Sequence, residues 1–343
     1  MDDVGWKRLT ALSPGVPAKF QMEVVVERAS AGKPITALQR PVIALAFSPD
    51  SRTIAATGGG MIPGPAAISV FDVESRTRTR ICHAHVMGVF DLAFDPRTGL
   101  LGSASHDYSV ILWELERRKS TFLVGGPDAG ISRKCLAFVD TRVVIGDGMT
   151  FDGEQAQLHT IDLATGECSI LFSLDGDRGV AHVARVPDGL IVVVQEMRSS
   201  AAAELRVVAP DGTPVSATPL PSSIYDLATV DARRVILAGR DVDGNTEVFA
   251  VDARSGVRKT SRVLGDAIGA YVAVSPSGDR IAVGHADRIE VCDAATLAVR
   301  AQLSVDAKVS SVAWSPDGRW IAAGTIAKTL HLFDAATGRE HLA

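Results

Sequence analysis

One pattern recurs seven times along the 343 residues of this chain: an apolar residue followed, in most cases, by an acid. Each pair ends a short strand-like run such as ISVFDV or LHLFDA. A repeat of about 40 to 50 residues means that one supersecondary unit is built repeatedly, and that each unit buries its surface against its neighbours. The seven pairs are Phe71-Asp72, Trp113-Glu114, Ile161-Asp162, Val207-Val208, Val251-Asp252, Cys292-Asp293 and Phe333-Asp334.

Turn signals divide each repeat into four short strands. An apolar run meets Pro and Gly or Asp in ALAFSPDS, DLAFDPRTG and SVAWSPDG, and a second turn, DLATG or DAATG, follows the apolar-acid pair. Pro fixes φ and Gly accepts positive φ, so the strands must end there. No helical periodicity lies between the turns. A single four-stranded sheet with two apolar faces cannot bury itself, but seven packed around an axis can. The sequence therefore predicts an all-β, seven-bladed β-propeller of four-stranded antiparallel blades.

The second repeat carries the most specific residues. Residues 84–115, AHVMGVFDLAFDPRTGLLGSASHDYSVILWEL, resemble the WD-repeat β-propeller family over a whole repeat without a gap. The resemblance implies a buried tetrad in which Asp107 accepts from His85, His85 engages Ser103, and Ser103 meets the indole N–H of Trp113. We interpret this set as structural rather than as a nucleophilic triad, because no GxSxG-like turn lies nearby.

The other repeats depart from the family's pattern. Only the second keeps its Trp, the seventh has Ala327 where the turn Asp belongs, and the fourth has lost both members of its terminal pair. The tetrad can therefore be complete in one blade only, and apolar packing is expected to hold the others.

The resemblance also predicts how the ring closes. The propeller is expected to span residues 20–343 as one domain, after an N-terminal tail of residues 1–19. An N-terminal strand, QMEVVVE at residues 21–27, is expected to become the outermost strand of the last blade, beside Leu330 to Phe333. The C-terminal REHLA competes for that position, but it is shorter and carries charge.

Composition excludes several classes of protein. With 46% hydrophobic and 22% charged residues the chain is typical of a soluble globular protein. Its longest apolar runs are far shorter than the ~18 residues of a membrane span. The N-terminus MDDVGWKRLTAL has acids and no apolar core, which favours a cytoplasmic location over export. A net charge of -5 argues against nucleic acid as a partner.

Two clusters have ligand-type residues but are not expected to bind metal. Cys82, His83 and His85 lack a second ligand group at matching spacing. Asp241, Asp243, Asn245 and Glu247 alternate around a Gly, as in a calcium loop, but an Asp-Gly-Asn hairpin turn explains the same residues. No cofactor or metal is therefore expected, although calcium at Asp241 and Asp243 stays open, as does the oligomeric state.

Enlarged loops indicate a candidate binding surface. The connections between second and third strands are long in several repeats, as in GGGMIPGPAA and GDGMTFDGEQAQ. In the family these connections and the loops between blades emerge on one side of the disc, called here the top face. Methionine is flexible and favoured on adaptable apolar surfaces, although it also fills gaps and these side chains could instead plug the channel mouth. The residues expected to bind a partner there are Met61, Ile62, Met87, His106, Met149, Phe151, Met197 and Arg198.

The sequence thus favours a non-enzymatic interaction scaffold that binds a protein or peptide on its top face. Two other classes stay open: a propeller enzyme or cofactor- or metal-binding propeller, and a passive structural or sensory module. Fold alone does not distinguish these classes, since function follows the site.

Overall fold

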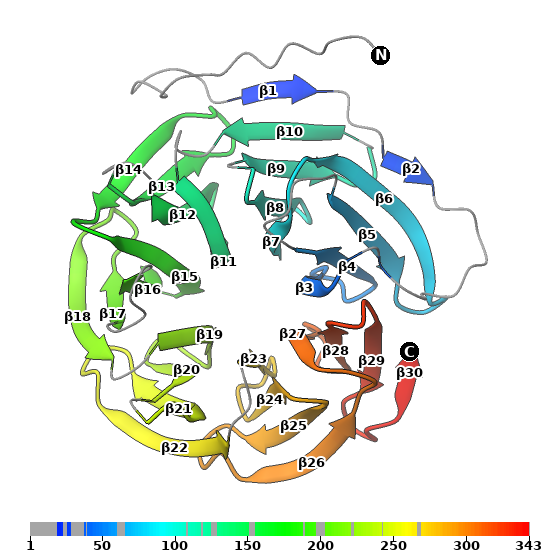
Figure 1. Cartoon of the computed structure of the whole chain (residues 1–343). Coiled ribbons are helices and arrows are strands. Elements are labelled where there is room, and N and C mark those ends of the chain that lie inside the picture. Colours follow the sequence, from blue (N-terminus) through cyan, green and yellow to red (C-terminus); the bar gives the residue numbers. More distant parts are fainter. Residues whose placement is uncertain are drawn as a thin grey trace.

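The computed structural model is a ring of seven antiparallel sheets around a central axis (Figure 1). The part of the chain that it describes contains strands and turns and no helix, so within that part no helix is long and apolar enough to cross a membrane. The described residues are 19–22, 26–28, 38, 40–59, 66–107, 109–117, 119–124, 129–150, 155–187, 189–196, 203–220, 223–241, 243–265 and 269–342.

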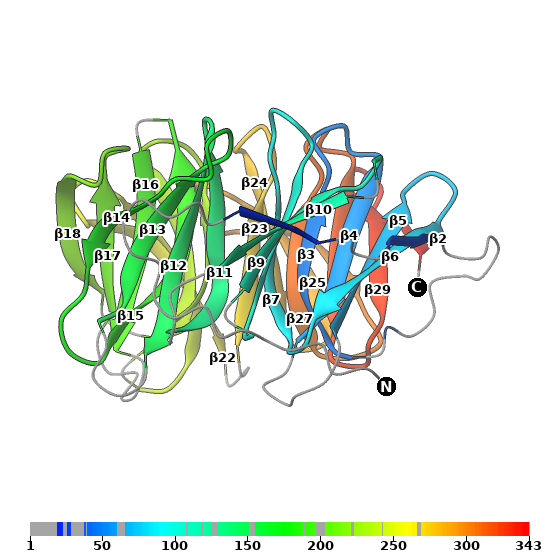
Figure 2. The same cartoon turned by 90° about the horizontal axis from the view of Figure 1, so that it is seen from above.

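Each blade contains four consecutive strands, numbered from the axis outward (Figures 1 and 2). Blades 1 and 2 are β3 (Val42–Phe47), β4 (Thr53–Gly58), β5 (Ala66–Asp72), β6 (Thr77–His85), then β7 (Val89–Phe94), β8 (Leu101–Ser105), β9 (Ser109–Glu114), β10 (Lys119–Val124). Blades 3 and 4 are β11 (Ala129–Val139), β12 (Arg142–Thr150), β13 (Gln157–Asp162), β14 (Cys168–Ser173), then β15 (Arg178–Val186), β16 (Gly189–Glu196), β17 (Ala203–Val208), β18 (Pro214–Leu220). Blades 5 and 6 are β19 (Ser223–Thr229), β20 (Arg234–Arg240), β21 (Thr246–Asp252), β22 (Arg258–Gly265), then β23 (Ala270–Val274), β24 (Arg280–His285), β25 (Arg288–Asp293), β26 (Val299–Ser304). Blade 7 is β27 (Val309–Trp314), β28 (Trp320–Thr325), β29 (Leu330–Asp334), β30 (Glu340–Leu342).

The apolar-acid pair ends or nearly ends the third strand of every blade, as predicted. The turn after the pair shows why the acid recurs. In blade 7, Oδ1 of Asp334 accepts the backbone N–H groups of Ala336 at 3.1 Å and Thr337 at 2.8 Å, and Gly338 completes the turn with φ of 70°. The carboxylate caps the reversal and the glycine takes the left-handed backbone that other residues avoid.

The core lies between neighbouring blades. One cluster joins Ile289 and Val291 of blade 6 to Val312 and Trp314 of blade 7, all of them buried. Contact between blades is close enough to require small residues: a Cβ added at Gly284 would lie 2.4 Å from Cγ2 of Val312. Each sheet is thus buried on both faces, as the apolar runs indicate.

Ring closure differs from the prediction. The outermost strand of blade 7 is the C-terminal β30, which pairs with β29, so the expectation that residues 21–27 occupy this position is wrong. A DAATG turn joins β29 directly to β30, and so short a loop costs little closure entropy. The N-terminal residues instead add fifth strands: β1 (Lys19–Met22) pairs with β10 of blade 2, and β2 (Val26–Arg28) with β6 of blade 1 (Figure 1).

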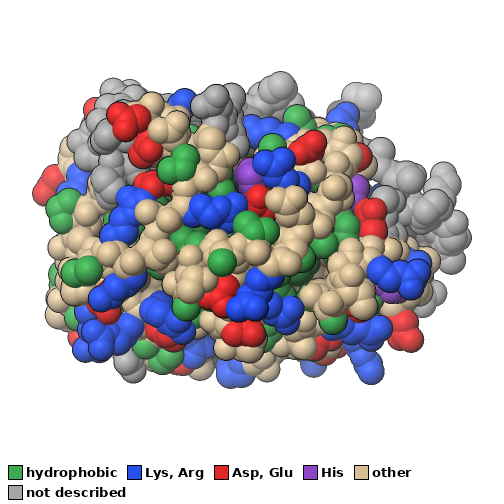
Figure 3. Space-filling model, turned by 90° about the horizontal axis from the view of Figure 1, so that it is seen from below, with side chains coloured by type: hydrophobic (Ala, Val, Ile, Leu, Met, Phe, Trp, Pro, Cys, Tyr) green, Lys and Arg blue, Asp and Glu red, His purple; other side chains and the backbone are tan. Residues whose placement is uncertain are grey.

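The rim of the ring is mixed in character. On the side drawn in Figure 3, basic and acidic side chains alternate and hydrophobic ones are scattered among them. Outer strands and turns do expose single apolar residues, and isolated residues of this kind need no partner. The large hydrophobic residues of this type on the outer strands and their turns are Ile170, Val215, Val257, Val263 and Val299.

Candidate functional site

The His85-Ser103-Asp107-Trp113 set is a hydrogen-bonded chain that joins His85, at the end of β6 in blade 1, to three residues of blade 2. Nδ1 of His85 lies 3.2 Å from Asp107 Oδ2, and Nε2 of His85 lies 2.8 Å from Ser103 Oγ. The indole N–H of Trp113 donates to the same Ser103 oxygen at 2.9 Å. Burial tends to raise the pKa of Asp107, but hydrogen bonds from His85, Ser109 and the backbone lower it overall.

This arrangement leaves Ser103 no role as a nucleophile. Its oxygen is fully buried and engaged by two neighbours, and His85 and Trp113 are also buried. A buried network in which every group is satisfied stabilises the fold rather than presenting a reactive atom.

Apolar clusters lie between the other blades, and polar pairs occupy several of these blades as well. In blade 3, His159 Nε2 donates to Asp147 Oδ2 at 2.9 Å. In blade 7, His331 bridges Asp306 at 2.9 Å and Glu340 at 2.5 Å. Other pairs among the described residues include Glu204 with Arg178 and Arg206 in blade 4, Glu247 with Arg258 in blade 5, and Glu290 of blade 6 with His285 and with Arg262 of β22.

A sequence signal for three of these pairs was available. His159, Glu290 and His331 each stand two residues before the apolar residue of the recurring apolar-acid pair in their repeat. In a strand, side chains two residues apart lie on the same face of the sheet, so each of these polar residues shares a buried face with that apolar residue. An ionisable residue at such a position needs a buried partner.

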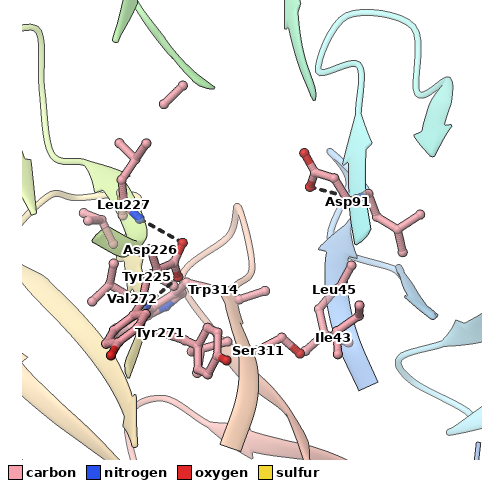
Figure 4. Close-up of a pocket in the computed structure, with 18 of the residues that line it drawn as sticks. Ile43, Leu45, Asp91, Tyr225, Asp226, Leu227, Tyr271, Val272, Ser311 and Trp314 are labelled. Carbon is pink, nitrogen blue, oxygen red and sulfur yellow. Dashed lines mark hydrogen bonds between the residues drawn. The ribbon is translucent and has the colours of Figure 1, made fainter. Parts of the chain in front are cut away.

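A cavity of about 370 Å³ follows the central axis and is lined by the innermost strands of all seven blades. Tyr225, Tyr271 and Trp314 lie on one side of it, and Asp91 lies on the opposite side (Figure 4). Phe90, Tyr225 and Tyr271 are half-buried, so their rings are accessible from the axis. The cavity is therefore bordered chiefly by aromatic and aliphatic side chains.

The two acids of this cavity are engaged by backbone. Oδ1 of Asp226 accepts the N–H of Leu227 and Oδ2 accepts that of Val272 in the next blade, both at 2.8 Å. Asp91 does the same with Leu92 of its own strand and Leu136 of blade 3. The carboxylates thus join inner strands of adjacent blades, which accounts for acids along an otherwise neutral channel.

Two of the residues expected on the top face lie near one end of this cavity. The His106 ring, in the turn between β8 and β9, meets the ring of Phe90 edge-on with 5.7 Å between centroids. Met87, in the loop that enters β7, is half-buried, and its carbonyl accepts a hydrogen bond from Ser105 at 3.3 Å. The structure therefore places both residues beside the start of the inner strand of blade 2.

The other residues of the expected surface are not placed. Met149 lies at the end of β12, but its side chain is not among those described. The remaining five fall outside the described residues: Met61, Ile62, Phe151, Met197 and Arg198.

Neither candidate metal cluster is assembled as a site. Burial raises the pKa of Cys82 to about 12, and His85 belongs to the tetrad. Asp241 accepts the backbone N–H of Asn245 at 2.8 Å and its side-chain amide at 3.2 Å, which closes a hairpin turn. Among the residues described, no three His, Cys, Asp or Glu side chains gather to hold a metal ion.

Comparison with known proteins adds to this description. Residues 76–114 and 300–334 match the family described as WD domain, G-beta repeat. Hydrazine synthase of Kuenenia stuttgartiensis is similar in structure with a TM-score of 0.69, at 16% identity over 90% of this chain and 99% of that one. The β-propeller domain of Cps50 (Swd1) from Myceliophteria thermophila is similar with a TM-score of 0.67, at 14% identity over 87% of this chain and 99% of that one. No curated protein matches this sequence. At these identities the structural likeness concerns the fold alone.

Proposed function

This chain is a seven-bladed β-propeller with WD-type repeats, and from that premise we propose that it is a non-enzymatic scaffold. It binds a segment of a partner protein, or a peptide, on the top face at the mouth of the axial cavity. The observation that carries the proposal is the set of half-buried aromatic rings around a largely neutral channel, Phe90, Tyr225 and Tyr271.

Aromatic side chains are suited to this role. They offer large apolar area at low cost in conformational entropy and dominate the binding energy of many interfaces. A volume of about 370 Å³ is near the small end for ligand pockets, so it accommodates a few side chains of a partner rather than a folded domain. Asp91 and Asp226 are engaged by backbone N–H groups, so the aromatic rings are the side chains that we expect to contact a partner most closely.

The non-enzymatic part of the proposal is supported by the tetrad. The His-Ser-Asp set that the repeat pattern aligns is enclosed between blades 1 and 2, where Ser103 is fully buried. The remaining residues of the expected surface extend the same site if their loops approach the mouth.

A photo-crosslinking experiment tests the proposal. A benzophenone amino acid replaces His106 at the top of blade 2, and a matched control replaces Thr98, an exposed residue in the opposite turn between β7 and β8. In the native host we expect a defined protein adduct from position 106 and none from position 98.

A second pair of variants checks the cavity itself. Tyr225→Ala and Tyr271→Ala together should weaken the adduct at position 106 by about tenfold or more, since losing two aromatic contacts typically costs over 1.4 kcal/mol. Melting temperatures identify variants that have merely unfolded. An adduct formed only from position 98, or one insensitive to both tyrosines, would contradict the proposal.

A further inference from the structure

The described cysteines differ sharply in exposure. Cys82, Cys135 and Cys292 are buried, whereas Cys168 is half-buried at the start of the outermost strand of blade 3. Burial raises the pKa values of the Cys82 and Cys292 thiols and closes them to reagents, although Arg262 lies 3.2 Å from the sulfur of Cys292. Cys168 is thus the described cysteine that an external reagent can reach.

Strand register brings an imidazole to this thiol. Cys168 pairs directly with Ile161 across β13 and β14, and His159 is two residues from Ile161 on the same strand. Side chains two apart in a strand share a face, so His159 and Cys168 are diagonal neighbours on one side of the sheet. The neighbouring Cys168 thiol is also one of the groups that raise the pKa of the His159 imidazole.

A carboxylate holds the other nitrogen of the imidazole. Asp147 Oδ2 accepts from His159 Nε2 at 2.9 Å and also accepts the backbone N–H of Gln157 at 3.0 Å. Asp147 and His159 are both more than nine-tenths buried. The order is thus a buried acid bonded to a buried imidazole, with a half-buried thiol as the diagonal neighbour of the imidazole.

We propose that Cys168 is a nucleophilic thiol and a modification site for small electrophiles, hydroperoxides in particular, with His159 as its proton partner and Asp147 as the positioning residue. The proposal is independent of partner binding on the top face.

The reaction proceeds by attack of the Cys168 thiolate on the terminal oxygen of a hydroperoxide. The sulfur–oxygen bond forms as the oxygen–oxygen bond breaks, and the departing alkoxide takes a proton from the His159 imidazolium to become an alcohol. Sulfur is oxidised by two electrons to a sulfenic acid, and the peroxide is reduced by the same two. A thiol can later restore the cysteine through a disulfide.

Charge supports this assignment. Burial tends to lower the pKa of His159, but the hydrogen bond that the imidazole donates to Asp147, together with Cys168, raises it to about 9, so the imidazole is protonated at pH 7. A protonated imidazole beside Cys168 is placed to supply the proton that the departing alkoxide takes.

The test measures the rate of oxidation cysteine by cysteine. The full chain is treated with hydrogen peroxide at pH 7, sulfenic acid is trapped with dimedone, and peptides are mapped by mass spectrometry. Cys168 should be labelled about tenfold or more faster than free N-acetylcysteine, while the three buried cysteines stay unlabelled and serve as internal controls.

Variants separate a reactive thiol from one that is only exposed. His159→Gln and the nearly isosteric Asp147→Asn should each slow labelling of folded Cys168 by about tenfold, whereas Ser169→Ala in the same strand should not. In urea, Cys168 of the wild type and of all three variants should be labelled at one common rate, because His159 and Asp147 lie beside Cys168 only in the folded protein. The proposal is overturned if Cys168 reacts no faster than N-acetylcysteine, or if folded wild type and both variants react equally.

Discussion

Apolar and polar residues both lie inside the blades, and they stabilise the fold in different ways. Apolar residues on alternate positions fill the space between sheets, and each contributes by leaving water. Polar residues at the same depth, such as Ser103 and Asp147, contribute only through the partner they find, since an unpaired buried polar group is destabilising. The contribution of a buried polar residue to stability is therefore tested by substituting its hydrogen-bond partner, because its degree of burial alone does not reveal it.

Ser103 is the clearest case. Ser103→Ala removes the oxygen shared by His85 and Trp113 and leaves two buried groups underpaired. We expect the free energy of unfolding to fall by about 1–3 kcal/mol, measured by urea denaturation. The exposed Ser169 is the matched control, and Ser169→Ala should stay within about 0.5 kcal/mol of wild type. Equal effects of the two substitutions would contradict a role for the tetrad in stability.

The pair of Asp147 and His159 makes stability depend on pH. The pKa of His159 is raised from 6.5 to about 9 in the fold. Between these two pH values the folded state therefore holds a proton that the unfolded state has released. This contribution is fully present below about pH 6.5 and is lost as pH rises through 9. Asp147→Asn should lower the free energy of unfolding by about 1.5–3 kcal/mol at pH 6 and flatten its fall between pH 6.5 and 9. Parallel curves for the two proteins across that range would be the contrary result.

The strands at the two ends of the chain have different structural roles. β30 completes blade 7 and supplies Glu340, which meets His331, and His341, which meets the ring of Trp320 at 4.7 Å. β1 and β2 lie outside blades that already have four strands. The C-terminal strand is therefore part of the ring, and the N-terminal strands cover its edge.

Truncation distinguishes these roles. Removing residues 340–343 should lower the melting temperature by about 5 °C, because β29 loses its neighbour and the buried His331 loses a carboxylate. Removing residues 1–28 should cost less stability but favour self-association, since β6 and β10 then present open edges. Differential scanning calorimetry and light scattering measure the two effects. A larger loss of stability from the N-terminal deletion would show that β1 and β2 hold the ring.

For the whole molecule, the ring depends on contacts between the first and last blades. The hydroxyls of Ser310 and Ser311 in β27 both donate to the carbonyl of Val42 in β3, at 2.6 and 2.9 Å. Residues about 270 positions apart in sequence meet there, so these bonds form only when all seven blades are in place. Elsewhere Asp91 and Asp226 join neighbouring inner strands in a similar way.

The double variant Ser310→Ala with Ser311→Ala tests this seam. It should lower the free energy of unfolding by about 1–3 kcal/mol, because the buried Val42 carbonyl loses both donors. Unfolding should remain a single transition if the blades unfold together, as monitored by circular dichroism and by tryptophan fluorescence. Noncoincident transitions for the two probes would show that the blades do not unfold together.

What the sequence by itself determined is local in origin. The number of blades and the third strand of each follow from the recurring pair and its turns, because alternation and turn chemistry act over a few residues. The tetrad of His85, Ser103, Asp107 and Trp113 was recognisable because one repeat holds all four residues. Ring closure by β30, the pairing of Asp147 with His159 and the axial cavity were decided only by tertiary structure. The cavity depends on how seven blades pack in a circle. The pairing of β29 with β30 and the bond between Asp147 and His159 depend on strand register within blades 7 and 3. Alternation and turn signals specify neither that packing nor that register.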